Sequence, residues 1–199
     1  RDPTENDKLK LLLRDADIFV QGYRPGAIAK YGFGPEEVAA KRPGIVYVNL
    51  SAYGHVGPWS SWRGFDSLVQ SATGIVHEGM IDAGADRPLP LPCQALDHAT
   101  GYLAAFGAMI ALKRRVEEGG SWMVRVSLAQ TGKWFDDLGR VEGLGTKKPT
   151  RTEIAGLLQK HDSPFGIIEH VRPPETFSET QPYWSSGSVP LGSNEPRWN

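Results

Sequence analysis

The sequence is poor in the residues that form disulfides, metal sites and membrane spans. It holds one cysteine, Cys93, in 199 residues, which excludes an intrachain disulfide and a cysteine-based zinc site. The five histidines lack metal-ligand spacing such as HExxH, so we expect no metal. No apolar run approaches the ~20 residues of a membrane span, and no secretory signal pattern is present. We therefore expect a cytoplasmic protein with no membrane partner.

An excess of one charge is also missing. The 22 basic residues balance 23 acidic ones and leave a formal charge of -1, so no nucleic-acid partner is expected. The nucleotide motifs GxGxxG and GxxxxGK[ST] do not occur. Glycine and proline are abundant, at 23 and 15 residues, which indicates a globular chain rich in loops. The sequence begins at Arg1 rather than Met, and we expect a processed chain or a piece of a longer one.

Alternating strand and helix patterns predict an α/β fold. Residues 18–20 and 45–50 are apolar runs typical of buried strands. Between them, residues 35–41 have proline first and two glutamates in the first turn, which indicates a helix. Residues 122–128 alternate as a strand does. By contrast, residues 75–93 and 163–199 are rich in loop-forming residues and are expected to be irregular.

The clearest helix pattern covers residues 95–115 and is rich in small side chains. Gly101 and Gly107 lie in its interior, where each glycine costs ~1 kcal/mol relative to alanine. We expect this cost to be offset by the close approach of a neighbouring helix or a ligand.

Asp97 is the strongest candidate for a chemical role. It lies just inside the start of the small-residue helix, where the helix dipole stabilises an anion. An ionised, accessible carboxylate can act as a nucleophile. The same position is also typical of an aspartate that only caps the helix, and Asp66 has the same two interpretations at another predicted helix start.

Two arginines are candidates for binding phosphate. Arg24 and Arg63 flank turns that contain glycine, and paired guanidinium donors suit phosphate oxygens. The alternative is that both are solvated surface residues.

Five segments together resemble the class III CoA-transferase family, which includes formyl-CoA transferase, carnitine CoA-transferase and α-methylacyl-CoA racemase. They are ADIFVQGYRPGAIAKYGFG at 16–34, RPGIVYVNLSAYGHVGP at 42–58, RGFDSLVQSATG at 63–74, and residues 96–115 and 119–131. Residues 177–198 are similar to the family's C-terminal end. The resemblance implies a Rossmann-like three-layer α/β domain of the class III CoA-transferase type in residues 1–140, incomplete at the N-terminus.

The resemblance also implies a reaction. Asp97 matches the family's catalytic aspartate, which attacks an acyl-CoA thioester and passes through a mixed anhydride and an aspartyl-CoA thioester. Coenzyme A then enters as the acyl-CoA substrate, and a carboxylic acid is the acceptor. Gly22, Tyr23, Lys30 and Tyr31 fall where the family lines its CoA nucleotide site. Arg63 matches a basic position that contacts CoA.

Several departures from the family pattern leave alternatives open. Family members are longer, and their first β-α segment and most of the small domain are expected to be lacking. Residues 141–199 would be a short remnant of that domain with a tail packed back on the large one. A catalytically incomplete CoA-binding or interaction subunit is therefore one alternative. A racemase is another, although Phe65 replaces the family's histidine. The family also implies an interlocked homodimer.

Overall fold

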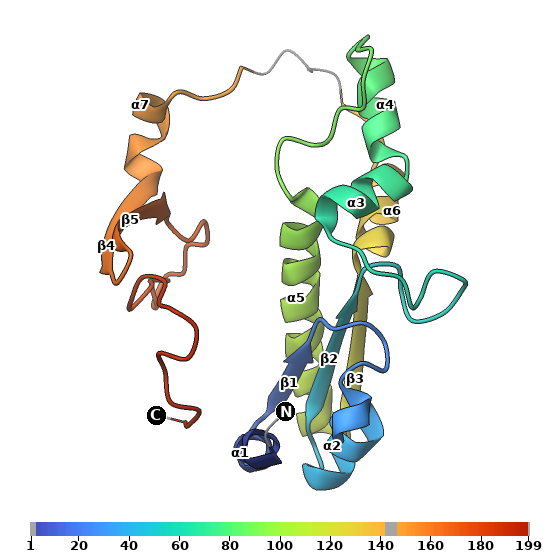
Figure 1. Ribbon diagram of the computed structural model, residues 1–199, viewed down its shortest axis with the longest axis vertical. Helices are drawn as coiled ribbons and strands as arrows, with labels where there is room; N and C mark the ends of the chain where they lie inside the picture. The colour runs from blue at the N-terminus through green and yellow to red at the C-terminus, as the bar shows by residue number, and fades with distance from the viewer. Residues whose placement is uncertain (1–2, 142–146, 199) are drawn as a thin grey trace. The chain divides into compact units, whose positions relative to one another are not determined.

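The computed structural model describes residues 3–141 and 147–198, which fall in two compact units, Arg1–Glu142 and Gly143–Asn199 (Figure 1). The first unit holds a parallel three-stranded sheet in the order β1-β2-β3. Its strands are β1 (Ile18–Gln21), β2 (Val46–Ser51) and β3 (Trp122–Ser127). In the register, Val20 pairs with Val48, which pairs with Val124. The predicted α/β class with a parallel sheet is confirmed.

Helices cover both faces of the sheet because β2 is apolar on both sides. Tyr47 packs in a cluster with Leu13 of α1 (Pro3–Arg14) and Val38 of α2 (Pro35–Lys41). Val46 and Val48 point the other way and pack against two alanines of α5 (Ala95–Glu118). The unit therefore has three layers, with α1 and α2 on one side of the sheet and α5 on the other (Figure 1).

Helix α5 runs along the sheet and approaches β3 closely. A Cβ added at Gly107 would lie 2.6 Å from Val124 Cγ1, whereas at Gly101 it would meet none of the residues that the structure describes within 4 Å. The expectation of a neighbouring helix or a ligand at both glycines was therefore wrong, because the close approach is made by a strand and only at Gly107. By length and composition α5 could also cross a membrane, with 22% of its most apolar window buried. Core helices of globular proteins pass the same test, and α5 has one face packed on β2 and β3.

Three further helices lie near the carboxyl end of the sheet (Figure 1): α3 (Asp66–Ala72), α4 (Ile75–Asp82) and α6 (Leu128–Asp137). The expectation of irregular structure was wrong for α4. Gly74 has φ +89° and separates α4 from α3. A glycine at this position is typical of a loop, and for that reason the helix that follows it was not predicted. Gly79 lets the backbone of Leu89 approach the helix, since an added Cβ would lie 2.5 Å from its carbonyl oxygen.

The second unit contains a short helical segment and a β-hairpin. Helix α7 (Arg151–Ile154) begins with a capping box in which the side chains of Thr150 and Glu153 bond each other's backbone N–H. It continues through η2 (Ala155–Leu157) into the antiparallel strands β4 (Leu158–Ser163) and β5 (Gly166–Val171). The expectation of an irregular segment from residue 163 was therefore wrong up to residue 171. The view of residues 141–199 as a small-domain remnant and tail stays a prediction.

Candidate active site

Buried polar side chains gather at the carboxyl ends of the three strands, the edge where open α/β sheets bind ligands. Gln21 ends β1 and its side-chain amide donates to Asn49 Oδ1 of β2. Gln21 Oε1 in turn accepts a hydrogen bond of 2.7 Å from the backbone N–H of Tyr23. This pair fixes the turn that leaves β1 and carries the predicted CoA-binding residues Gly22 and Tyr23.

Asp97 lies in the first turn of α5, as predicted, with an exposed side chain. The residue at the N-cap, Gln94, makes no side-chain capping bond. Instead, the backbone N–H of Asp97 donates a hydrogen bond of 3.0 Å to Asp66 Oδ2. The helix is thus capped from α3, by a residue 31 positions earlier in the chain.

Asp66 belongs to a buried network that holds the segment before α5. Its side chain is 2% exposed and accepts a second hydrogen bond, from Gln70 Nε2. Gln70 is equally buried, and its Oε1 accepts from the Leu91 N–H at 2.9 Å. Gln70 Nε2 also lies 3.4 Å from the Cys93 carbonyl oxygen. Gln70 therefore fixes the path of residues 91–93, and Asp66 fixes the first turn of α5 that follows.

The electrostatic environment makes the Asp97 carboxylate more basic than usual. Partial burial raises its pKa most, the negative charge of Asp66 raises it further, and the nearby His98 lowers it. A helix N-terminus by itself acts in the opposite direction, because its dipole stabilises the anion. Only the dipole could be foreseen from the sequence, since nothing local in the sequence places Asp66 beside Asp97.

A second feature is a groove of about 570 Å³ next to the turn after β1. Its lining combines apolar and aromatic side chains with one cation and comes from α1 and from residues 23–33. The lining residues are Glu5, Asn6, Leu9, Tyr23, Ala27, Ile28, Lys30, Tyr31 and Phe33. Within it, the Lys30 ammonium lies 5.1 Å from the centre of the Tyr31 ring.

The groove brings together half of the predicted CoA contacts. Tyr23, Lys30 and Tyr31 line it, whereas Gly22, Arg24 and Arg63 do not. Arg24 lies exposed in the turn that follows Tyr23, and Arg63 is exposed three residues before Asp66.

Helix α1 contributes to this groove, which was not predicted from the sequence. Asn6 Nδ2 donates to the Tyr31 carbonyl oxygen at 3.3 Å, which ties α1 to the groove wall. Leu9, from the same helix, is part of the lining. Leu9, Leu12 and Leu13 recur at helical spacing, which predicts a helix there but not which surface it covers.

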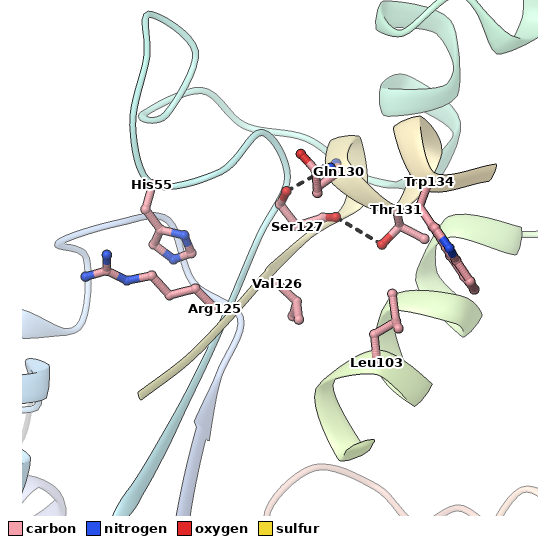
Figure 2. A pocket seen from close by; sticks show the side chains of 8 residues that line it. All are labelled: His55, Leu103, Arg125, Val126, Ser127, Gln130, Thr131 and Trp134. Atoms are coloured by element: carbon pink, nitrogen blue, oxygen red, sulfur yellow. Dashed lines mark hydrogen bonds between the residues drawn. The ribbon is translucent and has the colours of Figure 1, made fainter. Parts of the chain in front are cut away.

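Figure 2 shows a smaller pocket of about 240 Å³ at the end of β3. Its lining comes from β3, α5, α6 and the loop after β2, and comprises His55, Leu103, Arg125, Val126, Ser127, Gln130, Thr131 and Trp134. Burial and the charge of Arg125 lower the pKa of His55, which favours a neutral imidazole. No local pattern predicts that His55 and Arg125 lie together, because 70 positions separate them in the chain.

Across residues 3–141 and 147–198, no group of three or more His, Cys, Asp or Glu side chains could hold a metal ion. The exposed Cys93 is a free thiol. The chemistry available at the start of α5 is therefore that of a basic carboxylate beside a second, buried carboxylate.

The sequence of this chain is similar to those of known acyl-CoA transferases. The chain is 32% identical over 166 residues to an acetyl-coenzyme A transferase of Hypoxylon pulicicidum, covering 81% of this chain and 27% of that protein. It is 33% identical over 127 residues to a probable fatty acyl-CoA transferase of Mycobacterium tuberculosis, covering 63% and 32%. The chain thus spans about a third or less of these relatives.

Solved structures agree with the sequence relatives. The crystal structure of Rv3272 from M. tuberculosis superposes with a TM-score of 0.60 at 28% identity, covering 69% of this chain and 39% of that one. A Brucella suis protein, at 19% identity and a TM-score of 0.59, shares the fold. The model of CoA-transferase family III matches residues 1–147. The chain therefore belongs to CoA-transferase family III.

Proposed function

We propose that this chain carries the nucleophile of an acyl-CoA:carboxylate CoA-transferase, and that the nucleophile is Asp97. The observation that carries the proposal is the exposed carboxylate in the first turn of α5, whose pKa is raised by burial and by Asp66. A carboxylate of this kind is accessible to a thioester and more basic than a free aspartate.

The reaction conserves charge and needs no external proton donor. An Asp97 oxygen attacks the thioester carbonyl, the C–S bond breaks, and CoA leaves as a thiolate from a mixed anhydride. The thiolate attacks Cγ of Asp97, the anhydride C–O bond breaks, and the donor acid leaves as a carboxylate. The acceptor carboxylate then reverses the two steps, which yields its CoA thioester and regenerates the Asp97 carboxylate.

The groove beside η1 (Ala29–Tyr31) suits the nucleotide part of CoA. The Lys30 ammonium can pair with phosphate, and the rings of Tyr23 and Tyr31 can pack on adenine. Gly22 would allow the ligand to approach the backbone there. Arg24 and Arg63, both exposed, would bind phosphate or pantetheine from outside the groove.

Chemical trapping tests the nucleophile. The chain is incubated with acetyl-CoA or a fatty acyl-CoA, hydroxylamine is added, and the peptide that contains Asp97 is analysed by mass spectrometry. We expect a hydroxamate at Asp97 in the wild-type chain and in the control Asp86→Asn, and none in Asp97→Asn. Absence of the hydroxamate in a wild-type chain that binds the acyl-CoA contradicts the proposal.

A CoA-binding but catalytically incomplete chain is the second candidate. It is favoured by the groove at Tyr23, Lys30 and Tyr31, whose lining does not include Asp97. Calorimetric titration with CoA separates the candidates, because binding without trapping at Asp97 supports the second. Sedimentation analysis of the same sample tests the proposed homodimer.

A further inference from the structure

The buried carboxylate beside the proposed nucleophile has no part in the covalent steps above. We propose that Asp66 is the positioning residue of this site: it fixes the first turn of α5 and holds a second negative charge beside Asp97. The inference rests on the proposed role of Asp97 as the nucleophile. It gives α3, through Asp66, a role in positioning the nucleophile, although no bond is made or broken on α3.

The geometry of Asp66 is unusual for a structural cap. Its side chain is 2% exposed, and its two oxygens accept from neutral donors, the Gln70 amide and the Asp97 N–H. Burying a carboxylate without a cation is costly. A serine, threonine or asparagine would cap a helix about as well. The charge at this position therefore needs a reason beyond capping.

The reason lies in the charge of the neighbouring carboxylate. The nearby like charge of Asp66 disfavours the ionised form of Asp97 and so makes it more basic. When Asp97 attacks the thioester, its negative charge moves to the CoA thiolate and the acylated side chain is neutral. Repulsion between Asp66 and Asp97 is present before the step and relieved by it, which favours attack.

Gln70 makes the arrangement rigid. It donates to Asp66, and it holds the Leu91 N–H and the Cys93 carbonyl on the way into α5. The hydrogen bond from Gln70 therefore holds the Asp66 carboxylate in place beside Asp97. A rigid, preorganised charge acts on the reacting group without reorganising during the step.

The test is a carboxyl titration of the full chain that does not depend on turnover. The protein is labelled with ¹³C at the aspartate carboxyl carbons, and the Asp97 signal is assigned by its loss in Asp97→Asn. We expect Asp66→Asn to lower the pKa of Asp97, because the neighbouring like charge is removed. The matched control Ser67→Ala, exposed on the same helix, should leave it unchanged. An unchanged Asp97 pKa in folded Asp66→Asn overturns the proposal.

Trapping kinetics add the readout that a purely structural role would not move. The rate of hydroxamate formation in Asp66→Asn should fall several-fold at neutral pH, and its pH midpoint should move down with the Asp97 pKa. An unmoved midpoint counts against Asp66. If the wild-type chain forms no hydroxamate at all, the proposed function fails while the titration still decides the role of Asp66.

A measurement on the wild-type chain covers the case in which Asp66→Asn does not fold. First-turn N–H groups of a helix have no intrahelical acceptor and exchange readily with solvent. If Asp66 holds the Asp97 N–H, hydrogen exchange at that amide is slowed at least tenfold relative to an unstructured peptide. Exchange at the unprotected rate would show that the bond to Asp66 is absent, and the proposal would fall.

Discussion

The start of α5 and the groove beside η1 are built in different ways. Asp97 is held by Asp66 of α3, which lies 31 positions earlier in the chain, and Gln70 of the same helix holds residues 91 and 93. Tyr23, Lys30 and Tyr31 lie within nine residues of one another and need only one turn and one short helix to meet. The Asp97 carboxylate is thus placed by tertiary contacts, whereas most of the groove lining comes from one local segment, residues 23–33, and the rest from α1.

We expect the largest effect from Asp97→Asn, which should abolish the covalent step at α5 and leave CoA binding at the groove intact. Asp97→Asn keeps the shape of the side chain but removes the nucleophile, so hydroxamate trapping should fall to background while CoA binding persists. Mass spectrometry of the Asp97 peptide and calorimetry on the same sample measure the two effects. Parallel loss of CoA binding would show that the two regions are one site.

A pair of glycine substitutions tests how much the position of α5 depends on its contact with β3. At Gly107 an alanine Cβ would lie 2.6 Å from Val124 Cγ1, and overpacking of this kind costs about 1–3 kcal/mol. At Gly101 the Cβ meets nothing within 4 Å, so Gly101→Ala should stabilise by about 0.5–1 kcal/mol. Urea denaturation of the two variants measures both values, and equal effects would contradict the close approach.

The same elements show how far the sequence could predict the molecule. The strands at 18–21 and 46–51 and the helix at 95–118 carry their signals locally, in apolar runs and small side chains. Asp97 at the helix start could also be predicted, and the family resemblance grouped Tyr23, Lys30 and Tyr31, which line one groove. The hydrogen bond from the Asp97 N–H to Asp66 could not be predicted, because the pattern within each helix does not show which helices lie together in the fold. Helix α4 and strand β5 were not predicted, because Gly74 and Gly166 at their starts are typical of turns.

The groove should respond to loss of its cation. Lys30→Ala removes the ammonium that lies over Tyr31, and we expect about tenfold weaker CoA binding, equivalent to about 1.4 kcal/mol. The control Lys133→Ala, on the exposed face of α6, should bind CoA as the wild type does. Calorimetry at two salt concentrations measures the contribution of phosphate pairing, which weakens as salt rises. Equal affinity in both variants would place the CoA phosphates elsewhere.

The smallest effect concerns the stability cost of the site at α5. Because the pKa of Asp97 is raised in the folded chain by burial and by Asp66, ionisation of Asp97 opposes folding. The protonated Asp97 side chain carries no such penalty, so the stability that it preserves is fully present below the unfolded pKa. This stability is lost as the pH rises through the folded pKa. Asp97→Asn should therefore be more stable than wild type at pH 7, by less than about 1 kcal/mol because the exposed side chain is screened by solvent. The difference should vanish near pH 3, as measured by urea denaturation at both pH values. A variant that is less stable at pH 7 would mean that the dipole of α5 outweighs Asp66, and the start of α5 would then be an ordinary helix cap.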